Sequence, residues 1–177
     1  EVSNFDADNT ANGTVIDMAL MNGVKTFALN ASSADGDTKL DNVSAIVAAE
    51  MRNGAGDLNV AYASSVVSGT ADSQALTVSN STAGTFTANG VESVAVKSEL
   101  AKSTLTDIVS DKLKTVTITG DKDLKVSNSI DFAATANSTA IDGTIDASAF
   151  TGKLDITATT AQTVNIKGGS GDDTINL

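Results

Sequence analysis

Near its end the chain reads Gly168-Gly169-Ser170-Gly171-Asp172-Asp173-Thr174-Ile175-Asn176, and this segment decides the fold. It matches the pattern G-G-x-G-x-D-x-U-x at every fixed position, where U is a large aliphatic residue. Glycine at the first, second and fourth positions predicts a tight backbone curl with positive φ. The curl turns peptide carbonyls inward, and the Asp173 carboxylate joins them as a hard oxygen ligand of the kind that suits Ca²⁺. Ile175 is expected to end a short strand and to point into a narrow core.

This nonapeptide resembles the repeat of the RTX family, the calcium-binding repeat proteins that Gram-negative bacteria export. In that family an ion lies between two stacked glycine-rich turns, and each turn supplies half of the ligands. The resemblance implies a metal half-site formed by Gly168, Gly169 and Gly171 through their carbonyls and by Asp173 through its carboxylate. Asp172, at the free fifth position, is expected to be solvated. A hairpin turn rich in Gly and Asp is the alternative that the same residues leave open.

A complete site of this kind needs a second turn two nonapeptides away. Two nonapeptides before Gly168, residues 150–155 read Phe-Thr-Gly-Lys-Leu-Asp. Asp155 falls at the acidic position, but the glycines are missing. We therefore expect the partner turn beyond Leu177, in a longer chain of which this is an internal piece, and only half a calcium site here.

The composition removes several classes of function. The chain has 177 residues with no Cys and no His, so it forms no disulfide and lacks the commonest general base and the commonest transition-metal ligand. Its formal net charge of -11 repels nucleic acid and anionic membrane and attracts divalent cations. No apolar run reaches the about 18 residues of a transmembrane helix. We therefore expect no nucleic-acid partner, no membrane insertion and no enzyme activity.

The second half of the chain alternates apolar and polar residues in short runs, which predicts strands. These runs are 116–119, 124–127, 154–157, 164–167 and 174–177. Ile156, Ile166 and Ile175 follow one another at steps of ten and nine positions, a spacing found in hairpin sandwiches and in the coils of a parallel roll. The short runs and the β-branched side chains favour an all-β fold, an irregular parallel β-solenoid or β-roll with short rungs. β-Sandwich modules are the alternative.

Two pairs of segments resemble each other and indicate a degenerate internal repeat. Residues 22–29 and 89–96 share the order Asn-Gly-Val-charged-small-apolar-Ala-apolar, which aligns Gly23 with Gly90. In the second pair, one segment opens at Lys39-Leu40 and reaches Asp57-Leu58, and the other opens at Lys112-Leu113 and reaches Asp123-Leu124. Each copy is expected to form one block of sheet.

The expected domain organisation follows from this repeat. Residues 1–98 form a first β block, and residues 99–177 form a second block that runs into the start of an RTX-type roll. We expect the two blocks to join into one continuous solenoid-like unit. Residues 41–54 and 99–113 fit the spacing of a helix as well as that of a strand.

Other acidic residues could bind a cation, although their first expected role is in turns. They are Asp6, Asp8 and Asn9 near the start, Asp35 with Asp37, Asp121 with Asp123, and Asp142 with Asp146. The first group lacks the following Gly and the distal Glu of an EF-hand. The metal ligands that we predict are therefore those of the terminal nonapeptide.

A wider resemblance concerns residues 146–154, which read Asp-Ala-Ser-Ala-Phe-Thr-Gly-Lys-Leu and lead into a strand and then the nonapeptide. They resemble the region before the RTX array in secreted bacterial surface-layer proteins, and residues 90–96 and 113–120 resemble the repeating sheets of those proteins. The resemblance implies a structural protein that self-assembles with Ca²⁺ into a two-dimensional lattice on the bacterial outer surface. It also implies type I export to the cell surface, copies of the chain itself as partners, and contact with lipopolysaccharide through other domains.

An RTX-type adhesin that binds a glycan, a cell or ice is the alternative function. Threonine pairs could form a flat ladder on such a roll, namely Thr85/Thr87, Thr104/Thr106, Thr117/Thr119 and Thr157/Thr159. Their irregular spacing fits ordinary strand content better than a regular binding face.

Overall fold

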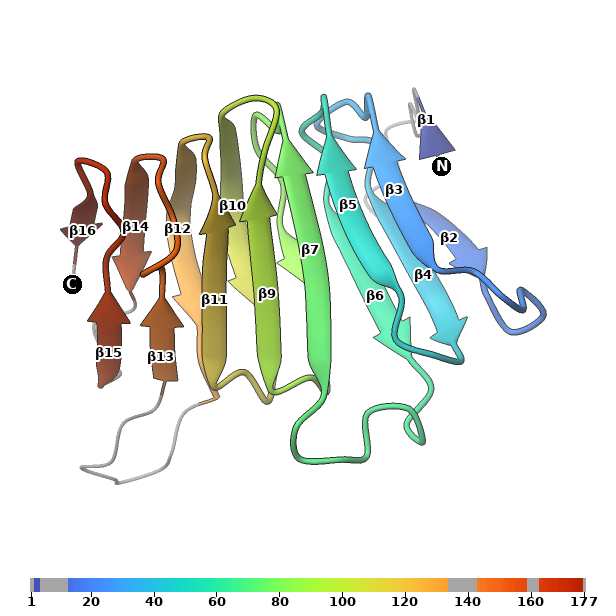
Figure 1. Cartoon of the computed structure of the whole chain (residues 1–177). Coiled ribbons are helices and arrows are strands. Elements are labelled where there is room, and N and C mark those ends of the chain that lie inside the picture. The colour runs from blue at the N-terminus through green and yellow to red at the C-terminus, as the bar shows by residue number, and fades with distance from the viewer. Residues whose placement is uncertain (1, 4–12, 134–142, 159–162, 177) are drawn as a thin grey trace.

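The computed structural model describes residues 2–3, 13–133, 143–158 and 163–176. Within these ranges the chain is all-β, and every strand pairing is parallel. The fold is therefore a parallel β-solenoid, which confirms the predicted roll and excludes the sandwich of antiparallel strands (Figure 1). No helix that could span a membrane occurs in the described residues.

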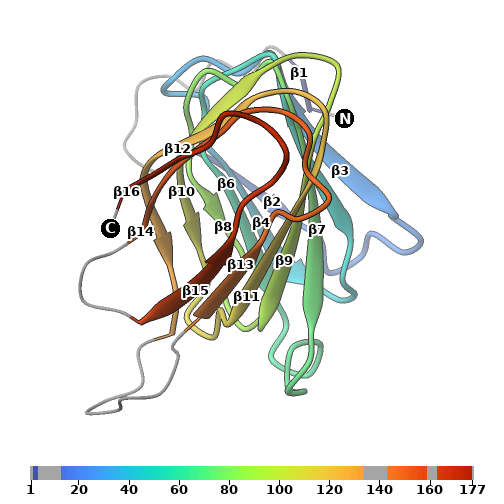
Figure 2. The same ribbon diagram turned by 60° about the vertical axis from the view of Figure 1, so that its left-hand side comes forward.

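The chain alternates between two sheets and advances by one strand position in each coil. Sheet A contains β1 (Val2–Ser3), β3 (Thr26–Asn30), β5 (Ala48–Arg52), β7 (Ser73–Ser79), β9 (Ser93–Ser98), β11 (Thr115–Gly120), β13 (Gly143–Asp146) and β15 (Val164–Lys167). Sheet B contains β2 (Thr14–Asp17), β4 (Thr38–Val43), β6 (Leu58–Tyr62), β8 (Phe86–Thr87), β10 (Ser103–Val109), β12 (Leu124–Asp131), β14 (Leu154–Ala158) and β16 (Thr174–Asn176). Figure 2 shows the two sheets as facing walls. The turns from sheet A to sheet B lie at the top of Figure 1, and we call this end the upper rim; the opposite end is the lower rim.

The length of a coil varies more than the nonapeptide pattern implies. A roll built only from nonapeptides would place paired residues of one sheet at a constant interval along the sequence. In sheet A the interval instead varies from coil to coil, since Ser73 pairs with Ser93, Ser93 with Thr115, and Thr115 with Thr144. Both sheets continue across residue 98, because β9 pairs with β11 and β8 pairs with β10.

The repeating unit is the single coil and not the larger block that the sequence comparison predicts. Phe27 reaches Val96 through three successive pairings, whereas the alignment of Gly23 with Gly90 would match Phe27 to Val94. Leu40 lies in sheet B, whereas Leu113 precedes β11 of sheet A, so this part of the predicted repeat is wrong. The two segments resemble each other in sequence because both form a turn at the lower rim followed by a strand of sheet A. This resemblance does not make them equivalent positions of a larger repeat.

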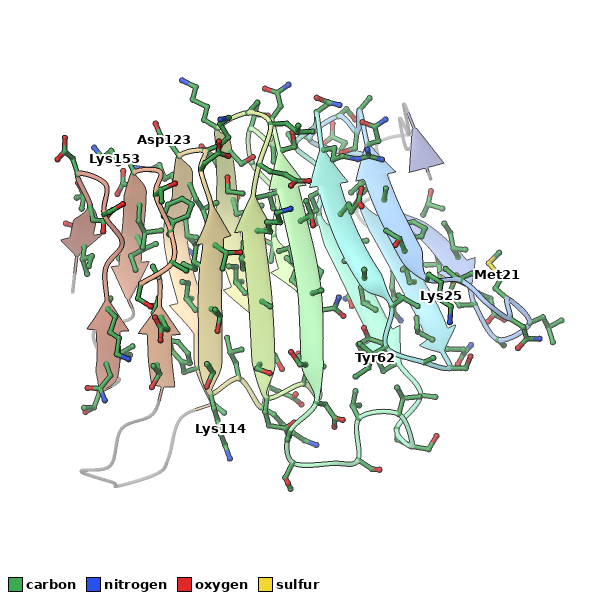
Figure 3. All side chains as sticks on the ribbon, viewed as in Figure 1. Met21, Lys25, Tyr62, Lys114, Asp123 and Lys153 are labelled. Carbon is green, nitrogen blue, oxygen red and sulfur yellow. The ribbon has the colours of Figure 1, made fainter. Side chains whose placement is uncertain are left out.

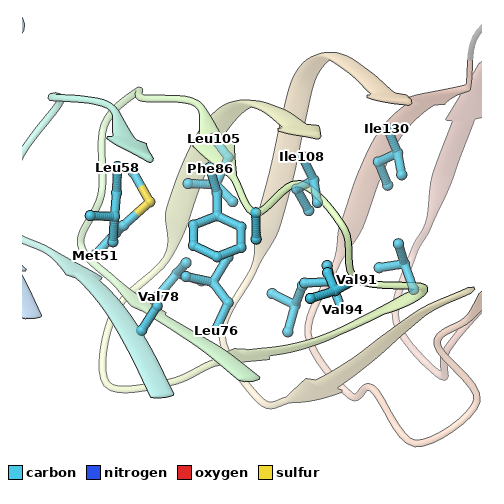
Figure 4. Packing of buried hydrophobic residues seen from close by; sticks show 14 of the residues in the cluster. Met51, Leu58, Leu76, Val78, Phe86, Val91, Val94, Leu105, Ile108 and Ile130 are labelled. Carbon is cyan, nitrogen blue, oxygen red and sulfur yellow. The ribbon is translucent and has the colours of Figure 1, made fainter. Parts of the chain in front are cut away.

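The core is a thin double layer between the two sheets (Figure 4). In β11, Val116 and Ile118 are fully buried and Thr117 is exposed, as the alternating pattern predicts. The in-register column Phe27, Ala49, Leu76, Val96 and Ile118 shows how each coil places an apolar residue above the previous one. Burying one Val, Leu or Ile contributes roughly 1.5–3 kcal/mol, so stacking provides what a single coil cannot.

One polar residue interrupts an apolar column. Gln74 is in register with Val94 and is completely buried. Its amide nitrogen donates to the carbonyl oxygen of Val47 at 2.9 Å, and its amide oxygen accepts from the Tyr62 hydroxyl. These contacts offset the cost of removing the amide from water.

Both segments of ambiguous periodicity contain strands. Residues 41–54 contribute the end of β4 and all of β5, and residues 99–113 contain β10. Ile156 and Ile175 pair in sheet B while Ile166 lies in sheet A, so the steps between these isoleucines do correspond to successive half-coils. Ile175 remains 38% exposed because no described strand pairs with the other side of β16.

A second column lies at the upper rim, where the chain leaves sheet A with positive φ. Four residues at equivalent positions adopt φ between 54° and 62°, namely Ala31, Asn53, Asn80 and Leu100. Asn tolerates this left-handed conformation better than most residues. The Asn53 amide donates to the Asn30 side chain at 2.9 Å, and the Asn80 amide donates to the Asn53 side chain at 3.1 Å. The same turn is therefore repeated and joined from coil to coil.

Replacing Phe86 by Ala should lower the free energy of unfolding by about 3–5 kcal/mol, because its fully buried ring projects from the two-residue strand β8 into the core. Replacing its neighbour Thr87 by Ala should change this free energy by less than about 0.5 kcal/mol. Urea unfolding followed by circular dichroism measures both effects. Equal losses in the two variants would contradict the inward placement of Phe86.

Candidate calcium-binding turn

The nonapeptide turn, residues 168–173, connects β15 to β16 at the upper rim. It stacks on residues 147–153, which connect β13 to β14 in the preceding coil. The Ser170 amide donates to the carbonyl oxygen of Phe150 at 3.0 Å, and the Ala147 amide donates to that of Lys167 at 2.9 Å. Two turns of successive coils are therefore in direct backbone contact, as the predicted roll requires.

The glycines are needed because the two turns approach closely. A Cβ atom on Gly169 would collide with the carbonyl oxygen of Phe150, and one on Gly171 would collide with that of Gly152. A Cβ atom on Gly168 would lie 2.8 Å from Oδ2 of Asp173. None of the three glycines has φ in the left-handed region, so the predicted positive φ is wrong. The pattern requires glycine because a side chain would not fit between the turns, and not because the backbone has positive φ.

Asp173 holds the turn through both of its carboxylate oxygens. Oδ1 accepts from the backbone amide of Leu154 in the preceding coil at 3.0 Å, and Oδ2 accepts from the amide of Gly169 at 2.8 Å. An ionised carboxylate offers about four lone-pair positions, so about two of them remain for a cation. In the structure this residue acts as a clamp between coils.

Asp155 does not occupy the position that a step of two nonapeptides predicts. It pairs with Thr174, the residue after Asp173, and therefore lies inside β14 and outside the turn. Its Oδ2 atom lies 2.8 Å from Nζ of Lys125 on the neighbouring strand. The extra residue in this coil shifts Asp155 onto the outer face of sheet B, where it forms an ion pair.

The donor atoms of the turn fit Ca²⁺ in type but are few. The segment supplies the Asp173 carboxylate, backbone carbonyls and the exposed Asp172, whereas Ca²⁺ in proteins takes about 6–8 oxygen ligands. The stacked residues 147–153 add no carboxylate and include the cationic Lys153. No group of three or more acidic side chains that could hold a metal ion occurs in the described part of the chain. A half-site at Gly168, Gly169, Gly171 and Asp173 therefore stays a prediction.

Two other acidic candidates, Asp146 and Asp121, take part in a turn and in an ion pair. Asp146 accepts from the backbone amide and the hydroxyl of Ser148 at 3.0 and 2.6 Å. These bonds, the hydroxyl first, lower the pKa of Asp146. Asp121 forms an ion pair with Lys122 at 2.7 Å, which lowers its pKa as well. Asp6, Asp8, Asn9 and Asp142 lie outside the described residues.

Sequence reasoning missed a column of aspartates that directly precede inward-facing residues of sheet B. Oδ1 of Asp37 accepts from the Asp57 amide at 2.8 Å, and Oδ1 of Asp57 accepts from the Thr85 amide at 2.7 Å. Oδ1 of Asp107 accepts from the Ser129 amide at 2.9 Å in the same way. Each carboxylate thus binds the backbone of the next coil. The dipeptide Gly-Asp at 36–37 and again at 56–57 was the available signal.

The carboxylates of this column repel one another, and the pKa of Asp57 shows the effect. Partial desolvation by the adjoining coils raises the pKa of Asp57, and the negative charges of Asp37 and Asp107 add to this effect. The hydrogen bond from the Thr85 amide acts in the opposite direction. Thr85 lies between Asp57 and Asp107 in the column, and Ser129 follows Asp107, so fewer like charges lie on adjacent coils.

No comparison with known proteins assigns this chain to a family. No family model matches it, and no match occurs among the curated proteins or among the solved structures. The resemblance to RTX and surface-layer proteins therefore rests on the residues quoted above, and function has to be argued from the chemistry of the rim.

Replacing Gly171 by Ala should destabilise the last coil, because the added methyl group would collide with the carbonyl oxygen of Gly152. The expected loss is about 1–3 kcal/mol, as for overpacking elsewhere. Amide hydrogen exchange in β14 and β16 reports this locally. Asp172→Ala, in the same turn but exposed, is the matched control, and similar exchange in both variants would show that the turns do not stack as described.

Replacing Asp57 by Asn should raise stability at neutral pH slightly, because the amide oxygen can still accept from the Thr85 amide while the charge is removed. A pKa raised on folding means that the native state binds more protons than the unfolded state just above the ordinary carboxyl range. Stability contributed by Asp57 is therefore lost as pH rises through the folded pKa. The difference between variant and wild type should grow as pH rises above the ordinary carboxyl range. Thermal unfolding at these pH values measures it; a constant difference would contradict the raised pKa.

Proposed function

We propose that this chain is part of an extracellular structural protein of the bacterial surface-layer type, which assembles into a two-dimensional lattice in the presence of Ca²⁺. The observation that carries the proposal is the contact between residues 168–173 and 147–153. There the nonapeptide glycines allow two turns of a parallel roll to stack, as a calcium-loaded roll requires. Location at the cell surface, type I export and contact with lipopolysaccharide through other domains rest on the sequence resemblance.

The charge distribution supports a role for divalent cations. The chain carries a net charge of -11, and aspartates of several coils bind the backbone at the same rim. A cation that binds the folded roll and not the unfolded chain adds its binding free energy to folding. Calcium would therefore reduce repulsion between coils and favour the ordered roll.

The ends of the described solenoid offer surface on which further coils or another copy can stack. Among the described strands, β15 and β16 each pair on one side only. A parallel edge of this kind presents unpaired backbone groups, and proteins must cover such edges. Apolar side chains are exposed at both ends of the described roll, with Leu20 91% and Ile175 38% accessible. Further coils of a longer chain, or contacts between copies at its outer ends, would cover this surface.

The residues offer little support for catalysis. The chain has no His, and burial raises the pKa of its single tyrosine, Tyr62, to about 12. A phenol with such a pKa keeps its proton near neutral pH and does not act as a general base. The side chains of Asn and Asp that hydrogen-bond one coil to the next agree better with a structural role than with catalysis.

An adhesin is the second candidate, but the threonine pairs do not form one binding face. Thr104 and Thr106 belong to sheet B, whereas Thr117 and Thr119 belong to sheet A on the opposite wall. A flat threonine ladder would require these pairs on one sheet. A binding partner of such an adhesin would have to contact another part of the surface.

Addition of Ca²⁺ to a longer chain that continues beyond Leu177 should raise its thermal midpoint and produce ordered sheets visible by electron microscopy. At a calcium concentration about tenfold above Kd, the gain in unfolding free energy is about 1.4 kcal/mol, which corresponds to a few degrees. Asp173→Asn should reduce the shift strongly, because the half-site loses its charge. Asp146→Asn, which changes an acidic residue at the end of β13 and outside the nonapeptide, is the matched control.

Three results would contradict the proposal. The first is an unchanged midpoint and no association at calcium concentrations up to about 10 mM, well above the range of extracellular sites. The second is an equal loss of response in Asp146→Asn. The third is stabilisation by Mg²⁺ to the same degree, which would indicate general screening and not a calcium site. A dispersed protein that binds a glycan surface would favour the adhesin.

A further inference from the structure

A hollow of about 420 Å³ lies on sheet B at the upper rim. The buried residues Ser81, Ser103 and Leu124 contribute to its lining. The hollow exists because β8 begins only at Phe86, so that residues 80–85 form a loop where a strand would otherwise continue. The loop contacts β10 through the Thr104 amide, which donates to the carbonyl oxygen of Ser81 at 2.8 Å. A depression of this volume is within the size range of sites for small molecules.

The walls of the hollow concentrate positive charge. Lys102, Lys125 and Lys153 line it together with Asp123 and Asp155. The whole chain has 11 basic residues against 22 acidic residues, so a site lined by more basic than acidic side chains departs from the rest of the molecule. Such a local excess attracts an anion that the remaining surface repels.

The acidic side chains of the hollow are already engaged. Asp155 lies 2.8 Å from Nζ of Lys125, and Oδ1 of Asp123 accepts from the backbone amide of Lys153 at 2.9 Å. The side-chain ammonium groups of Lys102 and Lys153 have no hydrogen-bond or ion-pair partner among the described residues. Figure 3 shows Lys153 beside Asp123 at the upper rim. Two cationic donors are therefore available for a ligand.

We propose that this hollow binds a small anionic sugar, whose phosphate or carboxylate is held by the ammonium groups of Lys102 and Lys153. A charged hydrogen bond from an ammonium group is among the stronger polar contacts. The sugar hydroxyls would meet Asn80, Thr82 and Thr104, which supply both donors and acceptors. A long polyanion is disfavoured because the whole chain, with a net charge of -11, repels it.

The proposal does not depend on the lattice function. Lys102 and Lys153 lie in the turns before β10 and β14, and neither belongs to the nonapeptide, although Lys153 ends the turn on which the nonapeptide stacks. Binding can therefore be measured without Ca²⁺ and on dispersed protein, so failure of one proposal leaves the other standing.

The test is a titration of the chain with glucose 6-phosphate, glucuronate, glucose and inorganic phosphate, followed by NMR chemical shifts at low ionic strength. The two anionic sugars should shift the amide signals of residues 80–82, 102–104 and 153. Lys102→Gln and Lys153→Gln should each weaken binding by about tenfold. Lys114→Gln is the matched control, since Lys114 is exposed at the lower rim (Figure 3). Circular dichroism confirms that each variant is folded.

Each other outcome overturns the proposal. Absence of saturable shifts with both anionic sugars excludes the site. Equal affinity for glucose 6-phosphate and inorganic phosphate shows that the hydroxyl contacts do not exist. Equal weakening in Lys114→Gln shows that net charge, and not the hollow, attracts the anion.

Discussion

The stacking of parallel coils at the strand spacing of about 4.8 Å constrains every other feature of this structure. Because each coil lies directly on the previous one, a residue type that works at one position is repeated at the equivalent position of the next coil. The aliphatic column from Phe27 to Ile118 in sheet A satisfies this constraint inside the core. The asparagines at the upper rim satisfy it in the turns, where the amide of one coil donates to the side chain of the coil before.

The same constraint explains the glycines and the aspartates. At Gly169 and Gly171 the backbone of one turn contacts the carbonyl groups of the turn before, and no side chain fits. At Asp37 and Asp57 the opposite solution occurs, since a short carboxylate reaches the backbone amide of the next coil. Asp173 binds amides of its own turn and of the preceding coil. Glycine and aspartate recur together because glycine allows the backbones of two coils to approach, and the aspartate carboxylate then accepts a hydrogen bond from the neighbouring backbone.

The sequence predicts the strands and the roll better than it predicts the site. Alternation and the steps between Ile156, Ile166 and Ile175 depend on the side-chain period of a strand, which is local and can be read directly. The length of each turn is not local, and one additional residue sufficed to move Asp155 from the expected turn into β14. Gln74 could not be foreseen either, because its burial depends on Tyr62 and Val47, which lie in other coils.

Repetition of aspartate brings like charges to neighbouring coils, and this repulsion connects the fold to the proposed function. Two unit charges one strand spacing apart repel by about 1 kcal/mol in water and by several times more in a less polar surrounding. The chain limits the repulsion within the column by placing Thr85 and Ser129 on either side of Asp107. It leaves the charges of Asp172 and Asp173 adjacent in the last turn. A hydroxyl group removes the repulsion permanently, whereas a cation removes it only when bound. Under the proposed function, calcium would therefore control the order of a roll that keeps adjacent carboxylates.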